Sequence, residues 1–459
     1  MWTALNSSRP GLVPLRAGAW LAQRAAPYTC SVIPVPEPAA PSLTRRILAF
    51  AGLPFLSLVT PFLFLPILAR VAGADAWLAI AVGQSVGAFL ALFIALGYNT
   101  VGPTMVALAD PADRPAVLRR SVLARLAIFL PAVVLAVAIS AIIVPESHRV
   151  EAALMSAAMA LTGLSSAWYM IGLGRAGLIV VYEMLPRIVA TVLAATLLLL
   201  LGQVIWYPLL LIGAWLVSVV LFLWRTVGLR ELTRSRPGEI RQVVAFNRSA
   251  MATEVVGGAY NSLAVTFVTL TASGAQAATY VSGDKLYRIG QYSVSALGNA
   301  LQGWVVEENR EHFAARARRA LGLHLGLGVL GLAAFATLGP WLSGLLFGEA
   351  VAIDPETALG LGVATLGIAL GTAVGRVILI GLGARREFLI SVIIGASVGV
   401  PAILVLAALF GAAGGAWGLA IGELASVTSQ SIFAARRWNR PATAAPDGGS
   451  PSASAGPVA

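Results

Sequence analysis

The sequence predicts an all-α polytopic membrane protein with about twelve transmembrane helices in two six-helix lobes, and three observations predict this class. First, 58% of the 459 residues are hydrophobic and 11% are charged, against roughly 45–50% and 25% in soluble domains. Second, apolar runs recur at the length of about 20 residues that a ~30 Å hydrocarbon core requires. Third, arginines cluster in alternate loops between the runs. A bilayer can cover so apolar a surface, whereas water cannot.

Each apolar run is expected to cross the membrane as a helix, because an open strand would leave backbone groups unpaired in lipid. The runs lie near residues 47–70, 77–99, 122–144, 152–172, 177–201, 205–224, 246–271, 278–303, 321–347, 357–381, 388–410 and 414–435.

The arginines beside these runs predict that both termini lie in the cytosol. With this orientation, 22 arginines fall in cytosolic segments and two, Arg70 and Arg149, fall outside. Cytosolic loops of membrane proteins carry such an excess of positive charge. The net charge of +11 is therefore interpreted as a topology signal and a contact with lipid headgroups, and no nucleic-acid partner is expected.

The longest basic loop divides the chain into two halves of equal helix number and equal orientation. We expect two lobes related by a two-fold axis along the membrane normal, with a substrate site between them. The tails are low in complexity and are expected to be disordered; for the first, a start codon assigned too far upstream is the alternative. The predicted parts are a tail at 1–42, the N-lobe at 43–226, a cytosolic linker at 227–242, the C-lobe at 243–436 and a tail at 437–459.

Residue types and motifs argue against an enzyme. The single cysteine, Cys30, excludes disulfides and CxxC sites, and three scattered histidines predict no metal site. No Walker A sequence, GxSxG elbow or HExxH motif occurs. The outer loops are short, whereas membrane glycosyltransferases and polysaccharide polymerases usually work on a sizeable external loop or domain. We therefore expect no enzymatic activity, no cofactor and no metal.

Charged residues within the predicted spans are the candidates for function, because a charge at the bilayer centre costs about 2.5–3.5 kcal/mol on insertion scales. Candidate substrate-binding residues are Arg187, Lys285, Arg288, Arg376 and Arg70. Candidate ion-coupling residues are Asp284, Glu254, Glu183 and Glu423.

The run at 278–303 is the most polar of the spans. Asp284 and Arg288 lie four residues apart and can pair on one helix face. The many hydroxyl and amide residues around them predict that this helix lines an aqueous cavity, where Lys285 or Arg288 could hold a phosphate. The alternative is that Asp284–Arg288 and Glu183–Arg187 are neutralised structural pairs.

The remaining charges allow two interpretations each. Glu254 and Glu423 have no opposite charge one turn away, so each is either protonated by burial or paired with another helix. A poised carboxyl would suit proton coupling, but a carboxyl bound to Ser or Thr would have the same sequence. Arg376 lies near a helix end and is either functional or an interfacial anchor, and Arg70 is expected to reach the outer interface.

Three segments resemble a known family. Residues 66–107 combine an Arg-containing helix end, a Gly-rich turn, a Gln-Ser pair and a closing Gly-aromatic-Asn. Residues 167–190 contain a Trp-aromatic-x-x-Gly-x-x-Arg junction, and residues 280–305 form a charged helix. These patterns are similar to those of Wzx-like O-antigen and repeat-unit flippases, in the multidrug/oligosaccharidyl-lipid/polysaccharide (MOP) superfamily. The chain departs from them in ARVAGADAW at the first helix end and in Gly303-Trp304, where the family more often has proline.

The resemblance covers about residues 43–436 and implies a function. A member of this family would move an undecaprenyl-diphosphate-linked oligosaccharide from the inner to the outer leaflet by alternating access, in the bacterial cytoplasmic membrane. Its cationic cavity would correspond to Arg187, Lys285 and Arg288, with Arg70 and Arg376 as further members. Membrane lipids and polysaccharide polymerases or glycosyltransferases would be its other partners.

Two other functions compete with the flippase. A cation-coupled exporter of the related multidrug (MATE-type) branch would need an acidic, aromatic cavity, for which the four carboxylates are available. An intramembrane enzyme, or a non-transporting component of a polysaccharide synthase, would show no transport in proteoliposomes.

Overall fold

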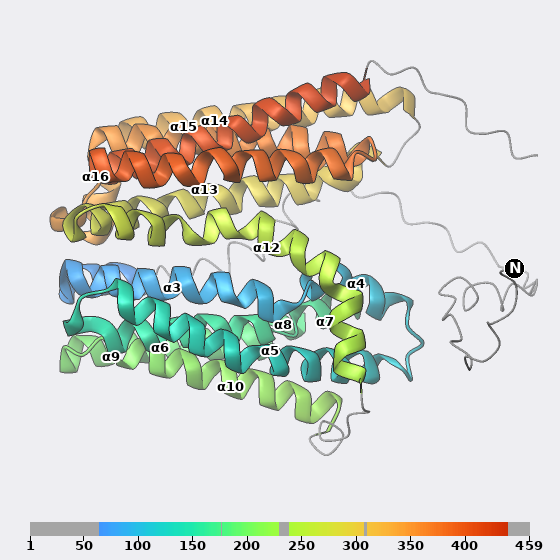
Figure 1. The fold of residues 1–459 in the computed structure, drawn as a ribbon, viewed down its shortest axis with the longest axis horizontal. Helices are drawn as coiled ribbons and strands as arrows, with labels where there is room; N and C mark the ends of the chain where they lie inside the picture. The colour runs from blue at the N-terminus through green and yellow to red at the C-terminus, as the bar shows by residue number, and fades with distance from the viewer. Residues whose placement is uncertain (1–63, 176, 229–237, 307–309, 439–459) are drawn as a thin grey trace, which may run out of the picture. The chain divides into compact units, whose positions relative to one another are not determined.

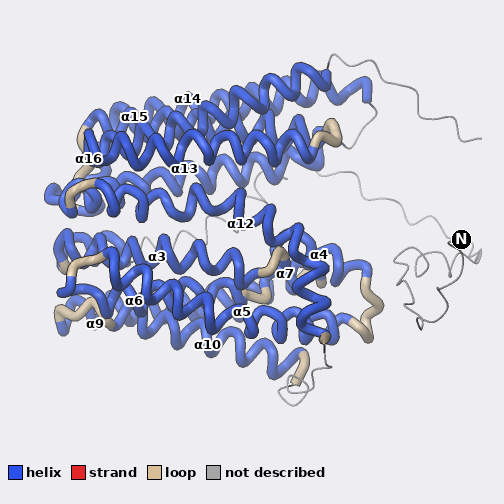
Figure 2. The backbone as a smooth tube through the Cα atoms, in the orientation of Figure 1, coloured by secondary structure: helices blue, strands red, loops and turns tan. Residues whose placement is uncertain are grey.

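The computed structural model describes residues 64–175, 177–228, 238–306 and 310–438. Helices joined by short turns make up this part of the chain, and no strand occurs in it (Figure 2). The predicted all-α class is therefore confirmed. The predicted tails at 1–42 and beyond 438, and most of the first span at 47–70, lie outside the described residues; residues 64–71 are helical.

The N-lobe, as we call the described helices up to α10, contains the predicted second to sixth spans (Figure 1). The predicted fourth span is broken by a 3-10 turn at Leu161–Leu164, and the fifth contains a π-helical turn at Val180–Met184, directly after α8. The helices are α3 (Gly73–Ala95), α4 (Tyr98–Leu108), α5 (Arg114–Ile143), α6 (Arg149–Ala160), α7 (Ala167–Gly172), α8 (Gly177–Ile179), α9 (Leu185–Leu201) and α10 (Trp206–Thr226).

The C-lobe contains the remaining six predicted spans. Its helices are α12 (Glu239–Thr271), α13 (Gly274–Val306), α14 (Arg310–Phe347), α15 (Pro355–Gly371), which continues into a π-helical segment at Thr372–Leu379, and α16 (Arg385–Trp438). α16 consists of two helices joined at Gly411, whose φ of 59° and ψ of −132° break the helical path. The predicted runs at 388–410 and 414–435 are the two halves of α16.

Eight of the described helical segments are long and apolar enough to cross a membrane. α16 counts once among them although it contains two predicted spans. α12 and α13 do not qualify, apart from a short apolar stretch at Asn261–Thr271. These two helices carry charged residues and contact α3 of the other lobe, so their polar faces are turned to protein rather than lipid.

α3 is the central helix of the N-lobe. It packs on α5 and α6 within its own lobe and on α12 and α13 across the interface. Two glycines allow the close approach to α6: a Cβ on Gly83 would lie 2.5 Å from the Ala152 carbonyl, and one on Gly87 would lie 2.3 Å from the Ser156 carbonyl. Small residues permit such contacts between membrane helices. The close packing holds the cavity-facing side of α3 in place.

The two lobes touch at both ends of the helices. We call the end where α10 finishes and α12 begins the linker-side end; the positive-inside pattern predicts that it faces the cytosol. There Glu239 of α12 pairs with Arg119 of α5 at 2.8 Å. At the opposite end the rings of Trp77 and Phe347 lie 5.2 Å apart. Contacts that cross the interface therefore join the two lobes at both ends.

Candidate functional site

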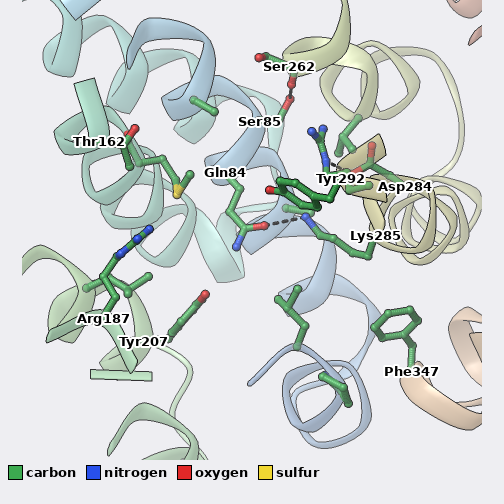
Figure 3. A pocket seen from close by; sticks show the side chains of 18 of the residues that line it. Gln84, Ser85, Thr162, Arg187, Tyr207, Ser262, Asp284, Lys285, Tyr292 and Phe347 are labelled. Carbon is green, nitrogen blue, oxygen red and sulfur yellow. Dashed lines mark hydrogen bonds and ion pairs between the residues drawn. The ribbon is translucent and has the colours of Figure 1, made fainter. Parts of the chain in front are cut away.

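A cavity of about 360 Å³ lies between the lobes. The N-lobe contributes side chains of α3, α6, α9 and α10, and the C-lobe contributes those of α12, α13 and α14. Figure 3 shows the arrangement, with Arg187 and Tyr207 on one wall and Asp284, Lys285 and Tyr292 on the other. The cavity lies between the two lobes, where the sequence predicts a substrate site, and polar side chains of both lobes line it.

α13 supplies the densest group of charges to this cavity. Lys285 donates from Nζ to Oε1 of Gln84 at 2.7 Å, across the lobe interface (Figure 3). Arg288 donates from Nε to Oδ2 of Asp284 at 2.9 Å and from Nη2 to the Asn261 carbonyl at 3.1 Å. The expected pair of Asp284 and Arg288 within one helix is present, and the predicted cavity-lining role of α13 agrees with its position.

Arg187 reaches the cavity from the N-lobe. Its guanidinium lies over the ring of Trp215, 5.0 Å from the centroid, in a cation–π contact. Its Nε donates to the backbone carbonyl of Glu183 at 2.9 Å. The Trp215 ring holds the face of the planar guanidinium, and only Nε of Arg187 donates to a partner among the described residues. The other N–H groups of Arg187 can therefore bind a ligand.

The proposed Glu183–Arg187 ion pair is not formed. The Glu183 carboxylate instead accepts hydrogen bonds from the Ser165 hydroxyl at 2.8 Å and the Ser166 backbone N–H at 2.9 Å. The π-helical turn at Val180–Met184 changes the register between the two residues, which places the carboxylate on the side of α7. Glu183 therefore fixes the broken fourth span, and Arg187 has no carboxylate partner among the described residues.

The other predicted residues lie outside the central cavity. Arg70 donates to the Leu345 carbonyl and lines a separate groove at the end opposite the linker. Arg376 and Glu423 line a second cavity of about 180 Å³ within the C-lobe, where Arg376 donates to Oδ1 of Asn299 at 2.6 Å. The structure thus brings three of the five predicted substrate-binding residues together.

Glu254 crosses the interface at the linker-side end. Its Oε1 accepts from the backbone N–H of Thr100 at 2.9 Å and from the Thr100 hydroxyl at 2.7 Å. Of the two sequence interpretations, the structure therefore shows the hydrogen-bonded one, with the partner in the other lobe.

Arg125, one of the 22 arginines counted above as cytosolic, is instead a buried residue of α5. It is 1% exposed in the N-lobe and donates to the carbonyls of Gly163 and Ser165 at 3.2 and 2.8 Å. Its guanidinium lies 5.8 Å from the ring centroid of Tyr98 and 5.7 Å from that of Trp168. Sequence alone could not show this, because the 3-10 turn that offers the carbonyls comes from another span.

The cavity is cationic and rich in hydrogen-bond donors. Arg187, Lys285 and Arg288 face it, whereas Asp284, paired with Arg288, is the one carboxylate that the described residues contribute to its lining. Hydroxyl groups of Tyr207 and the serines of α3 and α12 add further donors. Such a site can neutralise an anion with dispersed charge, and the forked guanidinium suits phosphate oxygens.

The fold of the chain is similar to those of several solved membrane-protein structures. No family model matches the sequence and no curated protein matches it. Among solved structures, an inward-facing MATE multidrug transporter of the MOP superfamily is similar, with a TM-score of 0.66, 14% identity, and coverage of 86% of this chain and 97% of that one.

A second similar structure is the lipid II flippase MurJ in an inward closed conformation. Its TM-score is 0.62 at 12% identity, over 86% of this chain and 87% of that one. A MATE transporter in a bent conformation is also similar, with a TM-score of 0.50, 15% identity, and coverage of 86% and 96%. The described chain is therefore a multi-pass helical membrane protein with the fold shared by these proteins.

Proposed function

We propose that this protein is a flippase that moves an undecaprenyl-diphosphate-linked oligosaccharide from the inner to the outer leaflet of a bacterial cytoplasmic membrane by alternating access. The main support for this proposal is that Arg187, Lys285 and Arg288 line one cavity between the lobes. A diphosphate is the part of the substrate that these groups would hold.

The balance of charge favours an anionic substrate. A cation-coupled drug exporter would use carboxylates in the cavity to bind cationic drugs, but the lining carboxylate Asp284 is 3% exposed and already pairs with Arg288. Lys285 and Arg187 have uncharged partners. A cation would therefore meet net repulsion, whereas a phosphate would gain charge-assisted hydrogen bonds.

The size of the cavity defines which part of the substrate it holds in this state. About 360 Å³ is at the small end of ligand pockets, which run from about 300 to 1,000 Å³. This volume suits the phosphates and not a full oligosaccharide with its polyprenyl chain. The lobes would have to separate further for sugars to pass, and the prenyl chain would stay in the lipid.

Glu423 is the best placed of the four candidate carboxyls for ion coupling. Asp284, Glu183 and Glu254 all accept hydrogen bonds from named partners. Glu423 is 9% exposed, lines the C-lobe cavity and has no hydrogen-bond partner within the described residues. A buried carboxyl of this kind can exchange a proton as the cavity opens and closes.

A deletion strain tests the proposed function in the cell. Loss of the gene should cause undecaprenyl-linked repeat units to accumulate on the inner leaflet and should remove the surface polysaccharide, with unchanged resistance to cationic drugs. Polymerases and glycosyltransferases of the same polysaccharide would be its functional partners. Normal surface polysaccharide combined with drug hypersensitivity would replace this function by multidrug export.

A further inference from the structure

The first part of α12 lies on the N-lobe, although the rest of the helix belongs to the C-lobe. Figure 1 shows α12 turning across α4 and α5 at the linker-side end. We call residues 239–254 the strap. At its start, Oε1 of Glu239 lies 2.8 Å from Arg119 Nη2 and 3.2 Å from Arg120 Nε. The apolar residues of the strap that pack against the N-lobe cluster are Ile240, Val243, Val244 and Met251.

The strap ends in a contact that we call the latch. There Glu254 accepts two hydrogen bonds from Thr100 in the first turn of α4. The positive end of a helix dipole favours a carboxylate at this position. Because Glu254 belongs to α12 and Thr100 to α4, the latch must break if this part of α12 leaves the N-lobe.

Gly97 lets the strap approach closely. It has a φ of +73°, and a Cβ there would lie 2.6 Å from Ala250 Cβ and 2.7 Å from Met251 N. One step further along α12, Gly258 packs against Leu92 of α3, which would lie 2.5 Å from an added Cβ. α12 is therefore packed tightly on the N-lobe at this end, and the same helix lines the cavity further on, at Ser262.

The interface between the strap and the N-lobe, which we call the seam, contains buried polar groups that lack hydrogen-bond partners among the described residues. Arg125 is 1% exposed, yet its Nε and Nη2 have no acceptor among the described residues. The hydroxyl of Tyr98 lies beside Asn247 of the strap. Buried donors without acceptors destabilise the state that contains them. Specific contacts, such as those of Glu239 and Glu254, therefore hold the strap on the N-lobe. Once they break, water would reach the buried polar groups of the seam.

We propose that the strap is the gate of the central cavity at the linker-side end, and that release of the latch lifts residues 239–254 from α4 and α5. The opened path would pass Arg119, Arg120 and Arg125 before it reaches the cavity. These three guanidinium groups would attract an anionic headgroup. The identity of that headgroup rests on the proposed function, whereas the gate itself does not.

The first test measures access to the cavity and needs no substrate. Replacing the single cysteine (Cys30→Ser) and adding Ala88→Cys, which lines the cavity on α3, gives one reporter thiol. A membrane-impermeant maleimide is applied from the linker side of oriented vesicles. Loss of the charged acceptor in Glu254→Ala should raise the labelling rate roughly tenfold, and Thr100→Val should raise it less because the backbone N–H remains.

Glu387→Ala is the matched control. It removes an ion pair with Arg437 that joins the two halves of α16, whereas the latch joins α12 to α4. Labelling should stay at the parent rate. Equal labelling of the parent and both latch variants, with unchanged elution and thermal unfolding, would overturn the gate, as would an equal rise in the control. If Glu254→Ala does not fold, Thr100→Val decides the result alone.

The second test locks the gate. In the Cys30→Ser background, Thr100→Cys with Glu254→Cys is cross-linked by a short bifunctional methanethiosulfonate and assayed for movement of the lipid-linked oligosaccharide. Movement should stop and return when the cross-link is reduced, whereas Glu387→Cys with Arg437→Cys should leave it unchanged. Movement through the locked strap would overturn the gate. A parent protein that moves no such lipid would contradict the proposed function, and the labelling test would still decide the gate.

Discussion

Lys285 and Arg288 lie on the same side of α13, but they depend on different kinds of partner. Arg288 neutralises Asp284, whose side chain is 3% exposed, whereas Lys285 donates to the neutral amide of Gln84. Removing a member of a buried ion pair leaves an uncompensated charge. Removing Lys285 leaves one amide without its donor. The two cations can therefore be distinguished by what their loss does to the fold.

Stability should fall far more in Arg288→Gln than in Lys285→Gln. Arg288→Gln leaves the buried Asp284 charge without its partner and should lower the free energy of unfolding by about 3–5 kcal/mol. Lys285→Gln loses one hydrogen bond of a charged group and should lower it by about 1.5–3 kcal/mol. Thermal unfolding in detergent measures both. Asp284→Asn added to Arg288→Gln should restore much of the loss. A double variant as unstable as Arg288→Gln alone would contradict the pairing.

Arg187→Lys should weaken binding of a polyprenyl diphosphate by roughly tenfold while preserving the charge, because an ammonium cannot hold phosphate bidentately or stack on Trp215 as the planar fork does. Isothermal titration with the purified protein measures the change. Arg149→Lys is the control, since Arg149 pairs with the exposed Glu146 away from the cavity. Equal affinity of Arg187→Lys and the parent would remove Arg187 from the binding site.

At the scale of elements, the apolar runs locate the spans but not the helix ends. The run at 122–144 overlaps α5, which spans Arg114–Ile143, and the run at 321–347 lies within α14, which begins at Arg310. Helices extend beyond the hydrocarbon into polar residues, where hydropathy gives no signal. The linker was likewise predicted at 227–242, whereas α12 begins at Glu239. The first part of the strap, residues 239–245, lies in such an extension, so hydropathy could not indicate where the strap begins.

Gly411→Ala should destabilise the C-lobe by about 1–3 kcal/mol, because an L-residue at this φ and ψ is strained and its Cβ would lie 2.6 Å from Gln276 Oε1. Gly213→Ala in α10 is the matched change, since nothing lies within 4 Å of an added Cβ there. It should be neutral or stabilising by a few tenths of a kcal/mol up to about 1. Thermal unfolding that gives the reverse order would contradict the description of α16 as two helices joined at Gly411.

In the whole molecule, the polar pattern of a helix predicts that it lines a cavity, but only the packing of the two lobes determines which charges meet there. The polar face of α13 predicted that Asp284, Lys285 and Arg288 line a cavity, because a charged helix surface must avoid lipid. Which other charged residues line the same cavity depends on how the two lobes pack together. No local sequence pattern predicts this packing. Arg187 and Arg376 both lie within predicted spans, but Arg187 faces the interface and Arg376 faces a cavity inside the C-lobe.

We propose above all that the protein moves a diphosphate-linked lipid between leaflets and binds the diphosphate in its central cavity. Its most direct test is a proteoliposome assay with a fluorescent polyprenyl-diphosphate oligosaccharide, in which an impermeant reagent reports how much of the lipid has changed leaflet. The parent protein should speed this exchange well above empty liposomes, and Lys285→Gln with Arg187→Gln should abolish the acceleration while the protein stays folded. Exchange at the rate of empty liposomes, or equal exchange in the double variant, would contradict the claim.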